Sequence, residues 1–406
     1  MMPKFNAKEI HFLKSDDPLS PPETYLSDLV FSKPDALANL EQRLTSDRER
    51  EDNFVCAILQ IPERETEEEQ DQASQICETG LDALLNKNRG IWEALDHRTF
   101  ALVYWDFKQK KKALRVLDTI IENISSGLKA DVLCGLSWFP HREDADLDCL
   151  SNALKALDHA AFFGKDHRQE FDAVSLNISG DRRYQSGDCR TAVAEYKAGL
   201  ALEPKNVNLL NSLGVCHGVM GDVELAAGYF EKALALNPNE IMVIYNMALI
   251  HQINELEDKA VLFLRKAHGI DPEVFEVELL LGHLMHKAGK TDQALPHLDR
   301  AIELNTQSGA ALTVKGDILL EQEKPAEAGK LFGEAVKRNP GNARAISGYA
   351  ISMALQKKNL SIALSFARES VTLDPGSPLF QERLETIEQL CNVQDTATAG
   401  EEIKSA

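Results

Sequence analysis

Apolar residues recur at three- and four-residue spacing through the second half of the chain, and short polar turns interrupt them at regular intervals. The clearest stretch is LGVCHGVMGDVELAAGYFEKALALNPN (213–239), in which two such patterns flank a Gly-Asp turn. This spacing places apolar side chains on one face of an α-helix, and Gly-Asp is a turn signal. The pattern therefore predicts pairs of antiparallel helices from residue 173 onward.

The helical pairs repeat with a fixed period. Prolines 204, 238 and 272 fall 34 residues apart, Thr306 takes the next place, Pro340 resumes the series, and Pro375 comes one residue late. Each unit carries a small residue, at Gly180, Gly214, Ala248, Gly282, Gly316 and Ala350. A bulky residue follows in the second helix, at Tyr196, Phe230, Leu264, Leu298 and Phe332. Because helices approach most closely where side chains are small, the bulky residue should fill the space beside that contact.

This repeat resembles the tetratricopeptide repeat in its length and in each of these positions. Six units cover residues 173–376, and the resemblance implies an all-α superhelical solenoid. The next segment predicts a capping helix over 377–391, with Phe380, Leu384, Ile387 and Cys391 facing inward, since the end of a solenoid needs a cover. Residues 392–406 lack an apolar period and are predicted to be a disordered tail.

The first helices of the pairs are expected to line a groove that binds an extended or helical peptide. The repeat register gives its lining as Asn177, Asp181, Tyr184, Asn208, Asn211, Val215, Met242, Tyr245, Leu249, Ile253, Leu279, His283, His286, Thr313 and Asp317. Tyrosine and methionine exposed in such a groove favour a protein partner. The same side chains could instead pack against neighbouring repeats or the N-terminal domain. His283 and His286 have a spacing that suits a metal, but no recognisable further donor accompanies them, so no metal or cofactor is predicted.

Before residue 173 the pattern changes to alternating strands and helices. Strands are predicted around 53–62, as a pair within WEALDHRTFALVYWDF (92–107), and over 131–140. Helices are predicted over 65–88, 111–125 and 146–166. The order strand, helix, hairpin, helix, strand, helix predicts an α+β sheet domain. Residues 1–50 form a partly helical N-terminal extension that could lead into this domain or pair with another chain.

The element order, together with LSNALKALDHAAFFGKDHRQEFD (150–172), resembles the GGDEF domain of diguanylate cyclases over residues 51–172. In that family the catalytic motif lies on the hairpin. Matching Phe100 to the motif's phenylalanine places Asp96, His97, Arg98 and Thr99 at the positions of Gly, Gly, Asp and Glu. The glycines let the backbone approach a nucleotide, and the acidic pair holds metal and supports the transition state.

Both halves of that motif are replaced here. The first strand also ends in Gln60, Ile61 and Pro62 near the place where the family carries a metal-binding aspartate. Without two carboxylates, two magnesium ions would lack protein ligands. The family's Arg-x-x-Asp inhibition site is missing as well, because Trp92 stands three residues after Arg89. The resemblance thus implies a degenerate, catalytically silent GGDEF-like domain.

These features predict a bacterial-type, non-catalytic adaptor or scaffold: the tetratricopeptide groove binds a protein partner, and the GGDEF-like domain performs no chemistry. Two alternatives stay open. The protein could be a signalling regulator that responds to a nucleotide or cyclic dinucleotide, as the remnant of a cyclase. It could also be a purely structural assembly scaffold.

Length and charge narrow the class of protein. The 406 residues suggest two or three domains, or one domain joined to a repeat array. A net charge of -20 should repel nucleic acid and anionic lipid surfaces, although a local basic patch could exist. The sequence contains no apolar run long enough to predict insertion into a membrane, and its first residues do not have the pattern of an export signal. A cytoplasmic location is therefore expected. The seven scattered cysteines favour reduced, mostly buried thiols.

Overall fold

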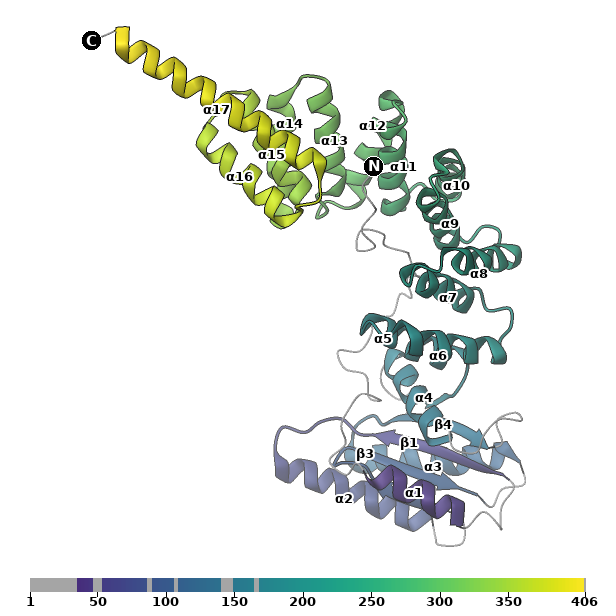
Figure 1. Ribbon diagram of the computed structural model, residues 1–406. Helices are drawn as coiled ribbons and strands as arrows, with labels where there is room; N and C mark the ends of the chain where they lie inside the picture. The colour runs from purple at the N-terminus through teal and green to yellow at the C-terminus, as the bar shows by residue number, and fades with distance from the viewer. Residues whose placement is uncertain are drawn as a thin grey trace. The chain divides into compact units, whose positions relative to one another are not determined.

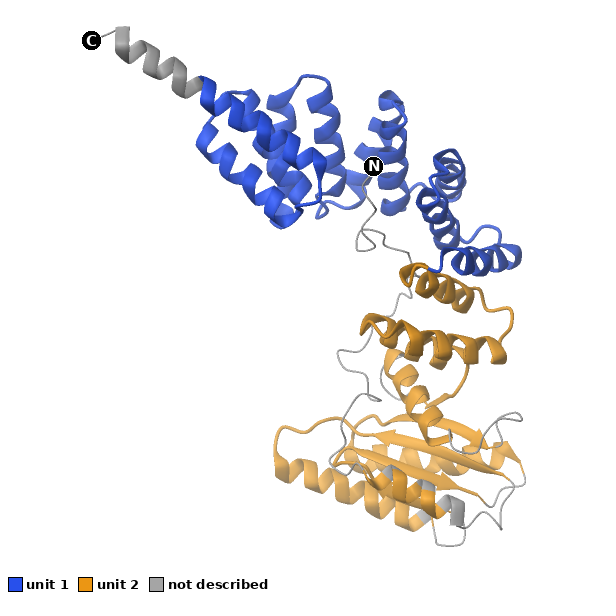
Figure 2. Ribbon diagram, viewed as in Figure 1, with its two compact units in different colours: residues 1–13, 222–406 blue, residues 14–221 orange. Residues whose placement is uncertain are grey.

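The computed structural model describes residues 35–46, 53–85, 90–105, 109–139, 149–163 and 168–404. The chain divides into two compact units, shown in Figure 2. We call residues 14–221 the N-unit, and residues 222–406 together with 1–13 the C-unit. Within the predicted N-terminal extension, α1 (Asp35–Ser46) is helical, as expected. Residues 1–34 and 47–50 of that extension lie outside the described residues.

A five-stranded sheet forms the centre of the N-unit (Figure 1). Its strands are β1 (Phe54–Gln60), β2 (Gly90–Ala94), β3 (Thr99–Tyr104), β4 (Leu133–Phe139) and β5 (Arg168–Glu170), in the spatial order β2-β3-β1-β4-β5. Only β4 and β5 pair in parallel; the other pairs are antiparallel. Every residue of β1 is buried. A strand covered on both faces needs apolar residues at almost every position, which is why FVCAILQ reads as a continuous apolar run.

Helices cover both faces of this sheet. On one face, Val55, Ala57 and Leu59 of β1 pack with α2 (Glu67–Leu84) and α3 (Lys110–Leu128). On the other face, Cys56 and Ile58 pack with α1 and α4 (Cys149–Phe163). This alternation along β1 follows from the two-residue period of a strand. The predicted order of strands and helices, and hence the α+β class of the N-terminal part, is confirmed.

The helical pairs follow in the expected order. In the N-unit they are α5 (Ala173–Gln185), α6 (Cys189–Leu202) and α7 (Val207–Val219). In the C-unit they are α8 (Val223–Leu236), α9 (Ile241–Ile253), α10 (Glu257–Ile270), α11 (Phe275–Lys287), α12 (Thr291–Leu304), α13 (Ala310–Glu321), α14 (Pro325–Arg338), α15 (Ala343–Leu355) and α16 (Leu360–Leu373). The limit between the two compact units thus falls between α7 and α8, inside the repeated part of the chain.

The predicted contact between small and bulky residues is present in both units. A Cβ atom at Gly180 would lie 2.3 Å from a ring carbon of Tyr196, which is fully buried. At Gly316 the corresponding distance to the ring of Phe332 is 2.8 Å. Any side chain at these positions would overlap the aromatic ring, so the pair fixes how closely its two helices pack.

A single helix, α17 (Pro378–Lys404), follows the last pair. Ile387 is buried against α15 and α16, with Leu384 and Cys391 packed around it, and Phe380 is also buried. The predicted inward face is therefore confirmed. The helix does not end near 391, however, and the expected disordered tail is helical to Lys404. A missing apolar period shows only that no face of the segment is buried, and it does not exclude a helix. The segment NVQDTATAGEEIK contains no proline that would stop one.

Two further expectations can be compared with the described residues. Five of the seven cysteines are buried, and Cys189 and Cys391 are half-buried, as predicted for most of them. Among the described helices, none is both long and apolar enough to cross a membrane.

Candidate partner-binding surface

The predicted groove residues differ widely in exposure. Buried members are Asn211, Val215, Tyr245, Leu249, Thr313 and Asp317. Half-buried members are Asn177, Asp181, Tyr184, Met242, Ile253, Leu279, His283 and His286, and Asn208 is exposed. The expected exposure of Tyr245 is therefore wrong, because only 7% of this residue is accessible. Burial, with the nearby carboxylate of Glu276 on α11, raises the pKa of its hydroxyl. The repeat register correctly places Tyr245 on a first helix, but it does not tell how far α11 covers it.

In the C-unit, the accessible part of the predicted lining lies on two successive first helices. Met242 and Ile253 of α9 and Leu279 of α11 are apolar and half-buried. His283 and His286, also on α11, add two imidazoles to this surface. His286 places Nε2 3.3 Å from the Oε1 atom of Glu321 on α13. The surface thus combines apolar area with groups that can form hydrogen bonds.

His283 has a specific electrostatic environment. Its burial, and then the positive charges of Arg344, His286 and Lys287, lower its pKa to about 4, although Asp317 opposes this shift. Near neutral pH the ring is consequently uncharged. A neutral imidazole carries one donor and one acceptor nitrogen, so His283 can pair with either a peptide N–H or a peptide carbonyl.

Asp317 is held by two arginines that the sequence analysis did not single out. Its Oδ2 accepts a hydrogen bond from Arg344 Nε on α15 at 2.8 Å, and its Oδ1 accepts one from Arg383 Nη2 on α17 at 2.8 Å. Its side chain is 7% exposed and that of Arg383 is 12% exposed. A buried carboxylate is costly unless it is paired. Val215, Leu249 and Ile351 hold this position in three other repeats, so a buried aspartate here was the available signal for charged partners, although Asp181 shows that the residue type alone does not identify them.

Two predicted polar residues of the N-unit, Asn177 and Asp181, belong to a hydrogen-bond network. Tyr196 donates to Asp181 Oδ1 at 2.6 Å, and Asn177 Nδ2 donates to Asp181 Oδ2 at 3.2 Å. Ser212 on α7 donates to Asn177 Oδ1 at 3.4 Å. These contacts join α5, α6 and α7. The network gives this polar flank a structural role, in line with the packing alternative.

The hairpin residues lie in a tight turn between β2 and β3. Asp96 Oδ1 accepts hydrogen bonds from the backbone N–H groups of Arg98 (2.8 Å) and Thr99 (2.7 Å). Asp96 and His97 therefore belong to the turn that joins β2 and β3. An aspartate that caps its own backbone two residues on is typical of a turn. Thr99 is 1% exposed and Phe100 is fully buried, so neither side chain points to solvent.

Three further contacts fix this turn to its neighbours. Arg98 Nη1 lies 2.9 Å from Glu63 Oε2, and the Arg98 carbonyl accepts from Ile61 N–H at 3.0 Å. The buried Gln70 of α2 donates from Nε2 to the His97 carbonyl at 3.0 Å. The turn is thus tied both to the segment after β1 and to α2, and its carboxylate is already occupied by backbone donors.

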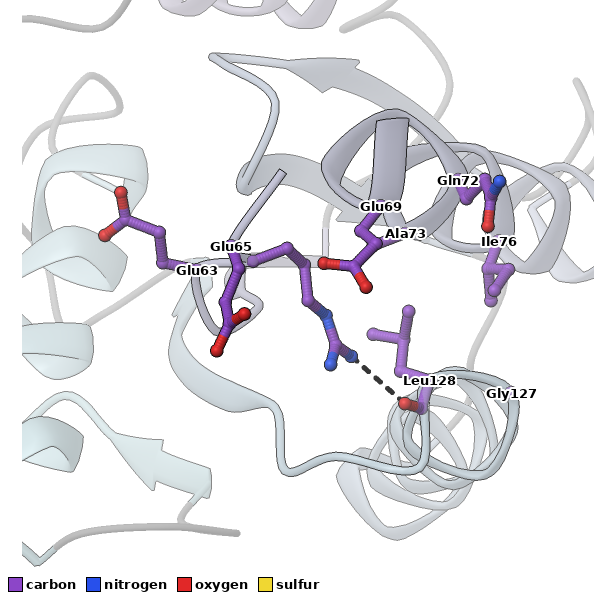
Figure 3. A pocket seen from close by; sticks show the side chains of 9 residues that line it. Glu63, Glu65, Glu69, Gln72, Ala73, Ile76, Gly127 and Leu128 are labelled. Atoms are coloured by element: carbon purple, nitrogen blue, oxygen red, sulfur yellow. Dashed lines mark hydrogen bonds between the residues drawn. The ribbon is translucent and has the colours of Figure 1, made fainter. Parts of the chain in front are cut away.

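A surface pocket of about 580 Å³ lies beside this segment, between the start of α2 and the end of α3. Glu63, Glu65 and Glu69 are among its lining residues, and in Figure 3 the Glu63 side chain points away from the other two. The guanidinium of Arg64 is the cationic group among the lining residues, and it donates to the Leu128 carbonyl at 3.0 Å. Glu63 is paired with Arg98, but Glu65 and Glu69 beside one cation that is already bonded still disfavour a polyanionic ligand such as a nucleoside triphosphate.

Comparison with known proteins agrees with the repeat register. A family model of the tetratricopeptide repeat matches residues 179–241, 279–343 and 313–378. The C-terminal part of the chain therefore carries tetratricopeptide repeats, as its sequence predicted. No curated protein matches the chain.

Several solved structures share similarity with about half of the chain. PilF of Pseudomonas aeruginosa is 20% identical, with a TM-score of 0.48, over 52% of this chain and 95% of PilF. YrrB, described as a tetratricopeptide-repeat protein with an unusual peptide-binding site, is 21% identical, with a TM-score of 0.38, over 46% of this chain and 96% of YrrB. PilW, described as a widely conserved type IV pilus biogenesis factor, is 16% identical, with a TM-score of 0.46, over 52% of this chain and 98% of PilW.

Proposed function

We propose that this protein is a non-catalytic adaptor whose tetratricopeptide repeats bind a peptide segment of a partner protein. The observation that carries the proposal is the half-buried set on α9 and α11, in which Met242, Ile253 and Leu279 stand with His283 and His286. Apolar side chains that keep accessible area beside a few hydrogen-bonding groups are the usual composition of a peptide-binding surface. The proposed location is the cytoplasm, in keeping with an odd number of scattered cysteines.

The chemistry of this set defines the partner. Met242, Ile253 and Leu279 would contact an apolar side chain, and methionine adapts to partners of different shape. His283, which is neutral near pH 7 because of its lowered pKa, would pair with a peptide N–H or carbonyl. The proposed partner segment therefore has an apolar anchor and an accessible backbone next to it.

The test uses a charge placed on the proposed surface. Partners are captured from the native host with the full-length protein, and the affinity of each purified candidate is then measured with Leu279→Glu and with Leu262→Glu. Leu262 lies on α10, the second helix of its pair, and is 67% exposed, so its substitution is the matched control. We expect Leu279→Glu to weaken binding about tenfold or more and Leu262→Glu to leave it unchanged. Equal affinities for the two variants would contradict the proposal.

Tyr245 and Leu249 are unsuitable positions for this test, because truncating a buried residue destabilises the repeat itself.

We further propose that the sheet domain is a GGDEF-like domain without cyclase activity. The proposal is supported by the element order and by the hairpin turn, in which Asp96 binds backbone N–H groups and Arg98 pairs with Glu63. The Asp96 carboxylate is engaged by backbone donors and the Glu63 carboxylate by a cation, which disfavours both as ligands of a divalent ion. Incubation of the protein with GTP and either Mg²⁺ or Mn²⁺, followed by chromatography, should show no cyclic dinucleotide. Product formation that Asp96→Ala abolishes would contradict this part of the proposal.

A further inference from the structure

Three potential metal ligands that are not members of the proposed peptide-binding set meet in the C-unit. His268 of α10, Glu278 of α11 and His297 of α12 bring their donor atoms within 4.8 Å of one another. The Nδ1 atom of His268 lies 2.5 Å from Glu278 Oε1, and that of His297 lies 2.7 Å from Glu278 Oε2. Glu278 is 1% exposed, whereas the side chains of His268 and His297 are 40% and 19% exposed. One carboxylate at the bottom of the cluster is thus covered by two imidazoles that reach the surface.

Comparison of the repeats shows that this cluster replaces an apolar contact. The position of Glu278 is occupied in the other units by aliphatic residues, namely Leu176, Leu210, Ile244, Leu312 and Ile346. The position of His268 is aliphatic as well, with Leu200, Leu234, Ile302 and Val336. The position of His297 is held by Glu195, Tyr229, Phe263 and Leu331. At the junction of the α9–α10 and α11–α12 pairs, two aliphatic positions and one variable position are therefore all held by metal-ligating residue types.

The neighbouring unit confirms that these positions touch. Leu312 packs with Ile302 and Leu331 in one hydrophobic cluster, and these three residues correspond to Glu278, His268 and His297. An aliphatic side chain at the central position stabilises the repeat by burial, whereas a carboxylate there must be compensated. The exchange thus costs stability unless the three polar groups act together.

The carboxylate remains ionised despite its position. Burial alone would raise the pKa of Glu278, but the hydrogen bonds from His297 and His268 outweigh it and lower the pKa below its usual value. Arg300 of α12 is a nearby cation, and its guanidinium is engaged by Glu273 and Glu303 at 2.9 Å each. The cluster consequently presents one anionic oxygen ligand and two imidazoles.

We propose that His268, Glu278 and His297 form a binding site for a divalent transition-metal ion, with Zn²⁺ as the expected occupant. Two imidazoles and one carboxylate are a known donor set for zinc, and they leave the fourth tetrahedral position to water or to a partner's side chain. Donor atoms around tetrahedral Zn²⁺ lie about 3.3 Å apart for metal-ligand distances of about 2.0 Å. The present spacings of 2.5 and 2.7 Å require the rings to move outward by less than about 1 Å, and their exposed edges leave room for this.

Metal binding would change which ring nitrogen of His268 and His297 carries a proton. Both Nδ1 atoms face an ionised carboxylate, which can only accept hydrogen bonds, so each Nδ1 carries a proton in the metal-free protein. A metal ion at this place takes the Nδ1 lone pairs, so the Nδ1 protons leave those atoms and each metal-bound ring keeps a proton on Nε2. A ¹⁵N spectrum of the imidazoles reports that change.

The decisive experiment replaces the three cluster residues by the residues that occupy the same positions in the preceding repeat. The triple variant His268→Leu, Glu278→Ile, His297→Phe places the side chains of positions 234, 244 and 263 at the cluster, so it should fold. Metal-free full-length protein is titrated with Zn²⁺ by calorimetry and with Co²⁺ by absorption. We expect one bound ion, Co²⁺ bands typical of four-coordination without a thiolate charge-transfer band, and a loss in affinity of at least about a hundredfold in the variant.

Two controls make the result specific. The variant keeps all seven cysteines, so any ion held by thiols remains bound in both proteins. Replacing His283 and His286 by Gln tests the other histidine pair and should leave the affinity unchanged. If the triple variant fails to fold, His297→Gln alone is measured and should weaken binding at least about tenfold. The proposal is overturned if the wild-type protein binds no ion, or if the variants bind it with wild-type affinity.

Discussion

His283 shows how one residue's surroundings set its chemistry. It occupies the repeat position held by Leu249 in the preceding unit, and Arg344, His286, Lys287 and Asp317 surround it. Burial is the largest cause of its lowered pKa, so the ring is neutral through the physiological range. A neutral ring adds no charge to a surface that already carries arginine and lysine, and this suits contact with an uncharged peptide backbone.

The lowered pKa of His283 predicts a pH-dependent stability. A pKa of about 4 in the folded protein, against about 6.5 in the unfolded chain, means that the unfolded chain binds more protons between these values. The free energy of unfolding should therefore fall as pH decreases from about 6.5 to about 4, by about 2 kcal/mol at pH 5. Urea unfolding of the wild type and His283→Gln at pH 7.5 and pH 5 measures the difference. An equal pH dependence in both proteins would contradict this assignment.

Asp96 is predicted to act on stability. Its Oδ1 accepts two backbone hydrogen bonds, from Arg98 and Thr99, so Asp96→Ala should destabilise the sheet domain by about 1–2 kcal/mol. Asp96→Asn keeps a side-chain oxygen and should cost less than about half of that. Tryptophan fluorescence measures the effect, because Trp92, Trp105 and Trp138 all belong to this domain. A stability of Asp96→Ala equal to that of the wild type would show that the turn does not need its cap.

At the scale of elements, the turns between paired helices use one backbone conformation. Gly187, Gly221 and Gly289 have φ values of 84°, 88° and 73°, and the equivalent positions of three other repeats hold Glu255, Glu323 and Lys357 at 58°, 59° and 55°. Left-handed backbone costs a residue with a side chain about 1–2 kcal/mol. These three turns therefore carry strain that glycine would avoid.

Glu323→Gly is accordingly expected to stabilise the C-unit. Glycine relieves the left-handed strain, but it also has greater conformational freedom in the unfolded chain. The net effect should be an increase of about 0.5–1 kcal/mol in the free energy of unfolding. Gly289→Ala is the converse control, since it introduces the same strain and should destabilise by a similar amount. Far-UV circular dichroism during urea unfolding measures both variants. Changes of the same sign would refute the argument.

The sequence predicts those contacts that depend only on spacing within one repeat. The pairing of Gly180 with Tyr196 follows from repeat spacing, because two helices of fixed length must place these residues opposite each other. The exposure of Tyr245 could not be predicted, since it depends on how closely α11 packs beside α9. The same holds for the two arginines around Asp317, which come from α15 and α17. His268, Glu278 and His297 lie 10 and 19 residues apart, a spacing that matches no metal motif, and only comparison of the repeats reveals them.

At the scale of the whole molecule, charge limits the class of partner. The net charge of -20, from 64 acidic and 44 basic residues, produces a field that repels polyanions beyond a few ångströms from the surface. Fluorescence anisotropy with labelled duplex DNA and single-stranded RNA should show no binding at tens of micromolar protein in about 0.15 M salt. Saturable binding that weakens steeply with added salt would instead reveal a local basic patch.

The division into two compact units predicts how the molecule unfolds. All three tryptophans lie in the N-unit, so fluorescence follows that unit, whereas circular dichroism follows the helices of both units, α1–α7 and α8–α17. The sheet packs both of its faces against helices that are distant in sequence, while stacked repeats are stabilised mainly by their nearest neighbours and open in steps. The two signals should therefore give urea transitions with different midpoints, and the transition seen by circular dichroism should be broader. Superimposable curves would mean that the two units unfold together, so that the boundary between α7 and α8 does not separate two cooperative unfolding units.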